Sequence, residues 1–178
     1  MNQECKYGTS FIIINTIILG ILSSFSHFAY NISGNSLIVG LFNPINESVW
    51  EHLKLMFFPN LLWWLVMYFI QKRRCEISLQ KWIIASTISL ITAPLLVIFI
   101  FYSYTGALGI ESVLLDIALV FICYFIAIKL ALNIYKHVHP STSKTVFSIL
   151  VIALFFLSFI IFTFSPPHLP IFSATESS

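Results

Sequence analysis

Histidine and carboxylate side chains are few in this sequence, and several of them have the chemistry of one shared site. Imidazole nitrogens and carboxylate oxygens bind zinc, and a carboxylate can also take a proton from water as a general base. The candidate metal ligands are His27, His52 and His168, and the candidate catalytic carboxylates are Glu47, Glu51 and Asp116. These residue types make zinc the cofactor to consider, although the sequence contains neither an HExxH zinc motif nor a GxSxG nucleophile motif.

The composition places these residues in a membrane protein. The chain of 178 residues is 58% hydrophobic and only 9% charged, and its mean hydropathy is +0.94. A soluble domain has about a quarter charged residues, so most of this chain must face lipid. The formal net charge of +2 is too small to indicate a nucleic-acid partner. We therefore expect an all-α helix bundle whose main partner is the lipid bilayer.

Five segments are long enough to cross the bilayer as helices, since a span needs about 20 largely apolar residues. They cover about residues 11–30, 47–70, 79–103, 110–135 and 144–165. No linker or internal repeat divides them, so residues 1–178 are predicted to form a single transmembrane domain. The first segment has an alternative interpretation as a cleaved signal peptide, with Lys6 at its basic start and Ser24 and Ser26 near the cleavage point.

The distribution of basic residues predicts the orientation of the bundle, because cytoplasmic loops retain Lys and Arg. The basic residues next to the ends of the spans all fall on one side: Lys6, Lys72, Arg73, Arg74, Lys81, Lys129, Lys136 and Lys144. The N-terminus is therefore predicted to be cytoplasmic and the C-terminus to lie outside. Most of the acidic residues fall in the outer half, which places the candidate site on the outer side of a multi-pass protein of the cell membrane.

The first span carries a polar stripe that leads to one of the candidate ligands. Its members lie on one helix face, at i, i+4, i+7, i+11 and i+14: Thr16, Gly20, Ser23, His27 and Tyr30. In lipid such a stripe must face other helices, where small residues allow close packing. His27 is then either a hydrogen-bonded packing residue or part of a site.

The start of the second span is the most distinctive segment. Asn46 is predicted to cap the helix, which puts Glu47 in the first helical turn, where negative charge suits the helix dipole. An ion pair between Glu51 and Lys54, at i and i+3, would explain both charges without any ligand. It leaves His52 unexplained. Aromatic residues of the same span are interpreted as packing or interfacial side chains, namely Trp50, Trp63 and Trp64.

Two further candidates lie elsewhere on the outer side. Asp116 falls several residues into the fourth span, about 10 Å deep at 1.5 Å per residue, and an intramembrane carboxylate marks a pathway, a proton relay or a paired site. His168 lies in a proline-rich segment after the last span, which either folds back over the outer mouth or forms a loose tail.

The cysteines are expected to be free thiols. Cys5, Cys75 and Cys123 form no CxxC pattern, and the first two fall on the predicted cytoplasmic side, where disulfides are rare.

The run NESVWEHLKL at residues 46–55, with His27 and Tyr30 before it and the ending PPHLPIF at 166–172, resembles a family of small bacterial membrane proteins known only as a domain of unknown function. The resemblance covers most of the chain. It implies a bacterial plasma or inner membrane protein and brings no activity with it.

Three functions follow from the sequence as hypotheses. The first is a metal-dependent membrane hydrolase, in which the histidines and a carboxylate hold zinc and another carboxylate activates water. The second is a protein that binds or transports a cation or small molecule, which with five spans would require a homo-oligomer or a membrane partner. The third is a non-catalytic membrane subunit or scaffold whose polar layer holds the helices together.

Overall fold

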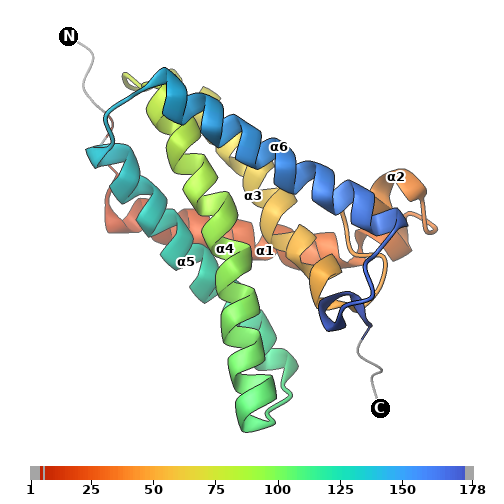
Figure 1. Cartoon of the computed structure of the whole chain (residues 1–178). Coiled ribbons are helices and arrows are strands. Elements are labelled where there is room, and N and C mark those ends of the chain that lie inside the picture. The colour runs from red at the N-terminus through yellow and green to blue at the C-terminus, as the bar shows by residue number, and fades with distance from the viewer. Residues whose placement is uncertain (1–4, 6, 175–178) are drawn as a thin grey trace.

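A computed structural model of the chain describes Cys5 and residues 7–174, and it is all-α as predicted. The helices follow the order α1 (Thr9–Ile32), α2 (Leu37–Gly40), α3 (Val49–Lys72), α4 (Leu79–Leu108), α5 (Val113–His137), α6 (Thr142–Phe164) and the 3₁₀ turn η1 (Pro170–Phe172) (Figure 1). The five long helices α1, α3, α4, α5 and α6 are each long and apolar enough to cross a membrane. They correspond to the five predicted spans.

Most helix boundaries differ from the predicted ones by a few residues, and two of the differences have a clear local reason. The helix α3 begins at Val49 because Ser48, not Asn46, is its cap, with the Ser48 side chain accepting a hydrogen bond from the backbone N–H of Glu51 at 3.3 Å. Glu47 therefore precedes the helix. The helix α4 continues to Leu108, past the predicted end at 103, and stops where Gly109 adopts a left-handed conformation with φ of 64°.

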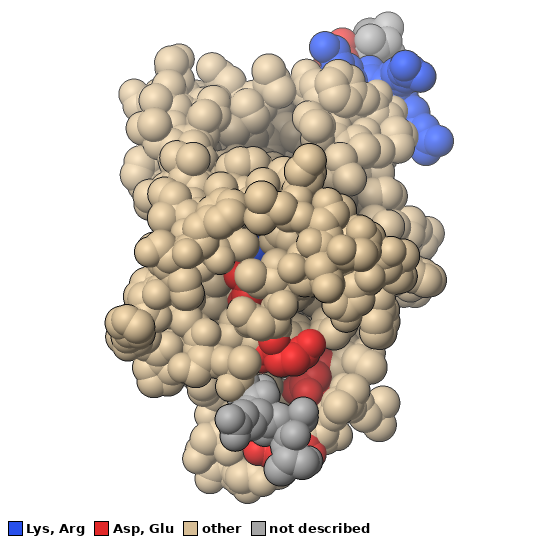
Figure 2. Space-filling model, turned by 90° about the vertical axis from the view of Figure 1, so that its right-hand side faces the viewer, with Lys and Arg blue, Asp and Glu red and all other residues tan. Residues whose placement is uncertain are grey.

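The charged residues divide between the two ends of the bundle. We call the end with the start of α1 and the connections 73–78 and 138–141 the basic end. The opposite end, with the segments 33–48, 109–112 and 165–174, is called the acidic end (Figure 1). Figure 2 shows Lys and Arg side chains gathered at one extremity of the molecule and most of the visible acidic side chains in the other half.

A proline inside α3 creates the contact that joins three helices. Pro59 has no N–H, so the carbonyl of Leu55 lacks its helical partner. The hydroxyl of Ser23 on α1 donates to this carbonyl at 2.8 Å, and the hydroxyl of Tyr124 on α5 donates to it at 2.7 Å. All three groups are buried. The freed carbonyl thus holds α1 and α5 against α3.

The predicted inward face of α1 is confirmed. Thr16, Gly20 and Ser23 are buried. A Cβ atom added to Gly20 would lie 2.2 Å from the ring of Phe121 on α5, so only glycine allows this approach. The polar stripe therefore faces protein, and it directs His27 toward α3.

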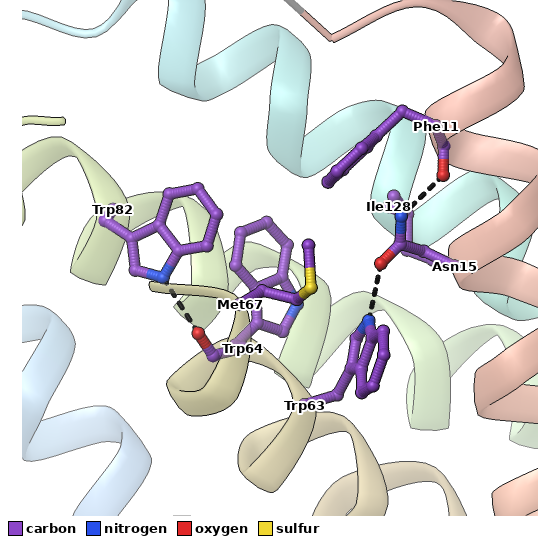
Figure 3. A pocket seen from close by; sticks show the side chains of 7 residues that line it. All are labelled: Phe11, Asn15, Trp63, Trp64, Met67, Trp82 and Ile128. Carbon is purple, nitrogen blue, oxygen red and sulfur yellow. Dashed lines mark hydrogen bonds between the residues drawn. The ribbon is translucent and has the colours of Figure 1, made fainter. Parts of the chain in front are cut away.

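The tryptophans of the basic half pack between helices, as predicted for Trp63 and Trp64. Trp63 donates its indole N–H to Asn15 Oδ1 at 2.6 Å, and Trp82 donates to the carbonyl of Trp64 at 3.0 Å (Figure 3). The space between them holds only about 10 Å³, which is about the minimum for one water molecule. These residues form a packed core and leave no room for a cofactor.

The expectation of three free thiols is wrong for two of them. Cys5 and Cys75 form a disulfide at the basic end, with their Cα atoms 5.4 Å apart, whereas Cys123 is free and buried. The disulfide ties the segment before α1 to the connection after α3. The prediction failed because it rested on the expected compartment and had no information on which residues the fold brings together.

Candidate metal centre

Two candidate metal ligands, His27 and His52, meet one candidate catalytic carboxylate, Glu47, at the acidic end. The Nε2 atoms of His27 and His52 lie 3.0 Å apart, and Glu47 Oε2 lies 3.3 Å from His52 Nε2 and 3.8 Å from His27 Nε2. Ligand atoms at about 2.0–2.1 Å from a tetrahedral zinc ion are roughly 3.3 Å from one another. The three atoms are therefore spaced as ligands of one ion, and we call His27, Glu47 and His52 the trio.

The backbone of Ser48 selects the ligand nitrogen of His52. His52 Nδ1 lies 2.9 Å from the carbonyl oxygen of Ser48. Because a carbonyl oxygen only accepts hydrogen bonds, Nδ1 carries the proton and Nε2 of the neutral ring carries a lone pair. Histidines that bind metals are commonly oriented by such a bond through their other nitrogen. The geometry thus presents Nε2 to the trio.

The contact between Ser23 and Leu55 positions both imidazoles. His27 follows Ser23 by one turn of α1, and His52 precedes Leu55 by about one turn of α3. Both histidines therefore lie one turn closer to the acidic end than this buried hydrogen bond. Fixing α1 against α3 at that level fixes the separation of the two rings.

Glu51 and Lys54 form the ion pair that the sequence left as an alternative. Lys54 Nζ lies 2.6 Å from Glu51 Oε2, and the two side chains are 0% and 3% exposed. The same ammonium donates to the carbonyl of Gly40 at 2.8 Å and to Thr163 Oγ1 at 2.7 Å. All three ammonium hydrogens are therefore satisfied, and Glu51 also accepts from the backbone N–H of Ile45 at 3.1 Å.

This ion pair holds the segment that carries Glu47. Gly40 and Ile45 lie on that segment, and both bond to the pair through backbone atoms. The side chain of Glu47 is 64% exposed, whereas those of His27 and His52 are 32% and 31% exposed. The trio therefore lies at the surface of the acidic end, and the buried pair of Glu51 and Lys54 holds the segment that carries Glu47.

The remaining candidates lie outside the trio. Asp116, in the first turn of α5, accepts a hydrogen bond from the hydroxyl of Tyr104 on α4. Glu51 is committed to Lys54, and His168 is exposed on the segment after α6. In the described part of the chain, the group of potential metal ligands that comes together is His27, Glu47 and His52.

The segment after α6 folds back, which was one of the two alternatives for it. Phe172 packs against Trp50 with ring centroids 4.9 Å apart and against Phe162 at 5.4 Å. Ala174 forms an isolated antiparallel bridge with Ser48. The end of the described chain is thus fastened beside the residue that precedes α3 and follows Glu47.

Comparisons with known proteins give a family and no activity. No curated protein and no solved structure matches the chain. The model of a family of unknown function, DUF6512, matches residues 1–177, which agrees with the expected uncharacterised family. The match spans nearly the whole sequence, so the chain belongs to the family of unknown function DUF6512.

Proposed function

We propose that this protein binds a zinc ion between His27, Glu47 and His52 and uses it for hydrolysis at the membrane surface. The observation that carries the proposal is the mutual approach of three ligand atoms, all within 4.8 Å of one another, from α1, the 41–48 segment and α3. Catalytic zinc sites hold the ion with three protein ligands and leave the fourth position to water. The trio likewise offers three protein ligands, and its Glu47 carboxylate is exposed to solvent.

The chemistry follows from the ion. Zinc lowers the pKa of a bound water to near neutrality, so that a hydroxide forms without a separate strong base. Held by His27, Glu47 and His52, the ion would supply Lewis-acid activation of water for hydrolysis: water would add to the acyl carbon of an ester or amide, the bond to the alcohol or amine would break, and that group would leave with a proton from the water. In this proposal Ser48 holds the ring of His52 through its carbonyl, and the ion pair of Glu51 and Lys54 holds the Glu47 segment.

We further propose that the acidic end faces outward from a bacterial plasma or inner membrane. The Lys and Arg residues at the ends of α3 and α5 favour a cytoplasmic basic end. The N-terminus would then be cytoplasmic, and the trio would meet substrates outside the cell. A homo-oligomer or a membrane partner is compatible with this arrangement.

The metal content of purified protein tests the first step. We expect about one zinc ion per chain in the wild type, and loss of zinc in His27→Ala and His52→Ala. His168→Ala is the matched control, because it removes an exposed histidine from the same end but outside the trio, and it should retain zinc. Zinc loss in all three variants, or no zinc in the wild type after zinc addition, would reject the site.

A second measurement separates hydrolysis from binding. Zinc-loaded protein should cleave a chromogenic ester, lose this activity on chelation and recover it when zinc is restored, whereas the His52→Ala variant should stay inactive. Stoichiometric zinc with no cleavage of ester, amide or phosphoester probes would reject the hydrolase and leave the cation-binding alternative.

A further inference from the structure

A large cleft lies at the basic end, opposite the trio. Its volume is about 1040 Å³, and its walls come from α1, α3, α4, α5 and the 73–78 connection. This is the size of a site for a ligand as large as a lipid headgroup, since small-molecule sites are about 300–1000 Å³. The cleft is separate from the packed tryptophan core, because the two share no lining residue.

The lining of the cleft is strongly basic. Four lysines contribute to it, namely Lys72, Lys81, Lys129 and Lys136. The lining contains one carboxylate, that of Glu76, so its formal charge is +3. Among the described residues, the ion pairs involve none of these lysines. Lys72 and Lys129 lie over the rings of Tyr68 and Phe125, with Nζ 5.5 Å and 6.0 Å from the ring centroids, and these contacts leave the ammonium hydrogens able to bind an anionic ligand.

Lys129 shows that the basic lining extends into the apolar part of the bundle. It lies eight residues before His137, the last residue of α5, which corresponds to about 12 Å along the helix. A lysine at such a depth marks a pathway or a binding site when it faces a polar cavity. Leu132 and Ile12 lie on the same lining and offer an apolar surface.

We propose that this cleft binds the phosphate group of an anionic ligand. Several ammonium groups around one cavity suit a phosphate, whose oxygens accept hydrogen bonds from each. Basic pockets between transmembrane helices bind the headgroups of anionic phospholipids, and the apolar side chains beside the lysines would contact the glycerol and acyl region. A soluble phosphate compound offers the same group without the acyl chains.

The test uses the full chain in phosphatidylcholine nanodiscs with two probes, phosphatidylglycerol and inorganic phosphate. The double variant Lys129→Gln with Lys136→Gln removes two charges from the cleft. Its matched control is Arg73→Gln with Arg74→Gln, which removes two exposed charges of the same end from residues outside the described lining. Lys129→Arg with Lys136→Arg keeps the charge and should restore binding. Thermal unfolding confirms that each variant is folded.

We expect saturable binding of phosphatidylglycerol that weakens about 25-fold in the lysine double variant, at roughly fivefold per lysine, and less than about twofold in the arginine control. Phosphatidylglycerol binding that inorganic phosphate does not displace would identify a lipid ligand. Saturable binding of inorganic phosphate alone, with the same sensitivity to the lysines, would identify a soluble one. Equal losses in the two double variants, or no saturable binding of either probe, would overturn the proposal.

Discussion

His27 and His52 present their Nε2 atoms to each other at 3.0 Å, although they belong to different helices and lie 25 residues apart. The carbonyl of Ser48 assigns the Nδ1 proton of His52, so the ring nitrogen that faces His27 is an acceptor. An acceptor nitrogen beside a second imidazole and the carboxylate of Glu47 supports the proposed metal site.

Lys54→Met should destabilise the protein by about 3–5 kcal/mol, because it leaves the buried carboxylate of Glu51 without its cation. The double variant Lys54→Met with Glu51→Leu should recover much of that loss, since no charge is then buried unpaired. Chemical unfolding of both variants in the same detergent measures the difference. If the double variant is less stable than the single one, charge burial is not the cause.

Replacing the hydroxyls that bond to Leu55 should show strong non-additivity. Ser23→Ala and Tyr124→Phe each leave the other hydroxyl on the freed carbonyl, so each should cost about 1 kcal/mol or less. The double variant leaves the carbonyl unsatisfied and should cost more than the sum. Pro59→Ala restores an N–H to the helix and should reduce the cost of the double variant. Thermal unfolding of these variants measures each loss of stability. A loss in the double variant equal to the sum of the two single losses would contradict this prediction.

Asp116→Asn should leave zinc bound, because the structure pairs this carboxylate with Tyr104 rather than with the trio. Asparagine keeps an oxygen that can accept the hydroxyl hydrogen, so the fold should change little. Asp116→Leu removes the acceptor and should lower the stability without removing zinc. Loss of zinc from the folded Asn variant would return Asp116 to the site, as the sequence first suggested.

The Cys5–Cys75 pair offers a test of orientation. The structure joins the two cysteines in a disulfide, whereas cytoplasmic thiols are kept reduced, so thiols in growing cells would support the proposed cytoplasmic basic end and a disulfide there would count against it. Rapid acid quenching followed by thiol alkylation and mass spectrometry measures the two forms.

Labelling of added cysteines gives an independent control. In a cysteine-free background, an impermeant thiol reagent should reach a cysteine near Ser33 and not one near Ser78. A disulfide in growing cells together with the reverse labelling pattern would place the basic end outside.

Helical spacing made the inward face of α1 predictable, because the residues i, i+4 and i+7 of a helix share a side. Thr16, Gly20 and Ser23 are buried as expected. The partner of His27 could not be derived in the same way, because spacing within one helix says nothing of its rotation against another. This rotation is fixed by the carbonyl of Leu55, which is a backbone group. Its only sign in the sequence is Pro59, which cannot donate a helical hydrogen bond to that carbonyl.

The start of α3 separates Glu47 from Glu51, although both residues were equal candidates for a catalytic carboxylate from the sequence. Asn46 and Ser48 are both good caps, but Ser48 caps α3, while Asn46 Oδ1 accepts a hydrogen bond from the N–H of Ser48 at 2.9 Å in the turn before the helix. Since the helix begins after Ser48, Glu47 lies outside the helix and its carboxylate reaches the imidazoles. Glu51 points into the bundle toward Lys54. Local propensity could not choose between the caps, so it could not assign the carboxylates.

The three partners of the Lys54 ammonium come from parts of the chain that are synthesised at different times. Gly40 and Glu51 precede or adjoin Lys54 and are synthesised with it, but Thr163 lies on α6, the last long helix to leave the ribosome. Until α6 docks, one N–H of a buried ammonium lacks its partner. The final helix is therefore needed to complete the hydrogen bonding of this ammonium, whose partner Glu51 also holds the segment that carries Glu47.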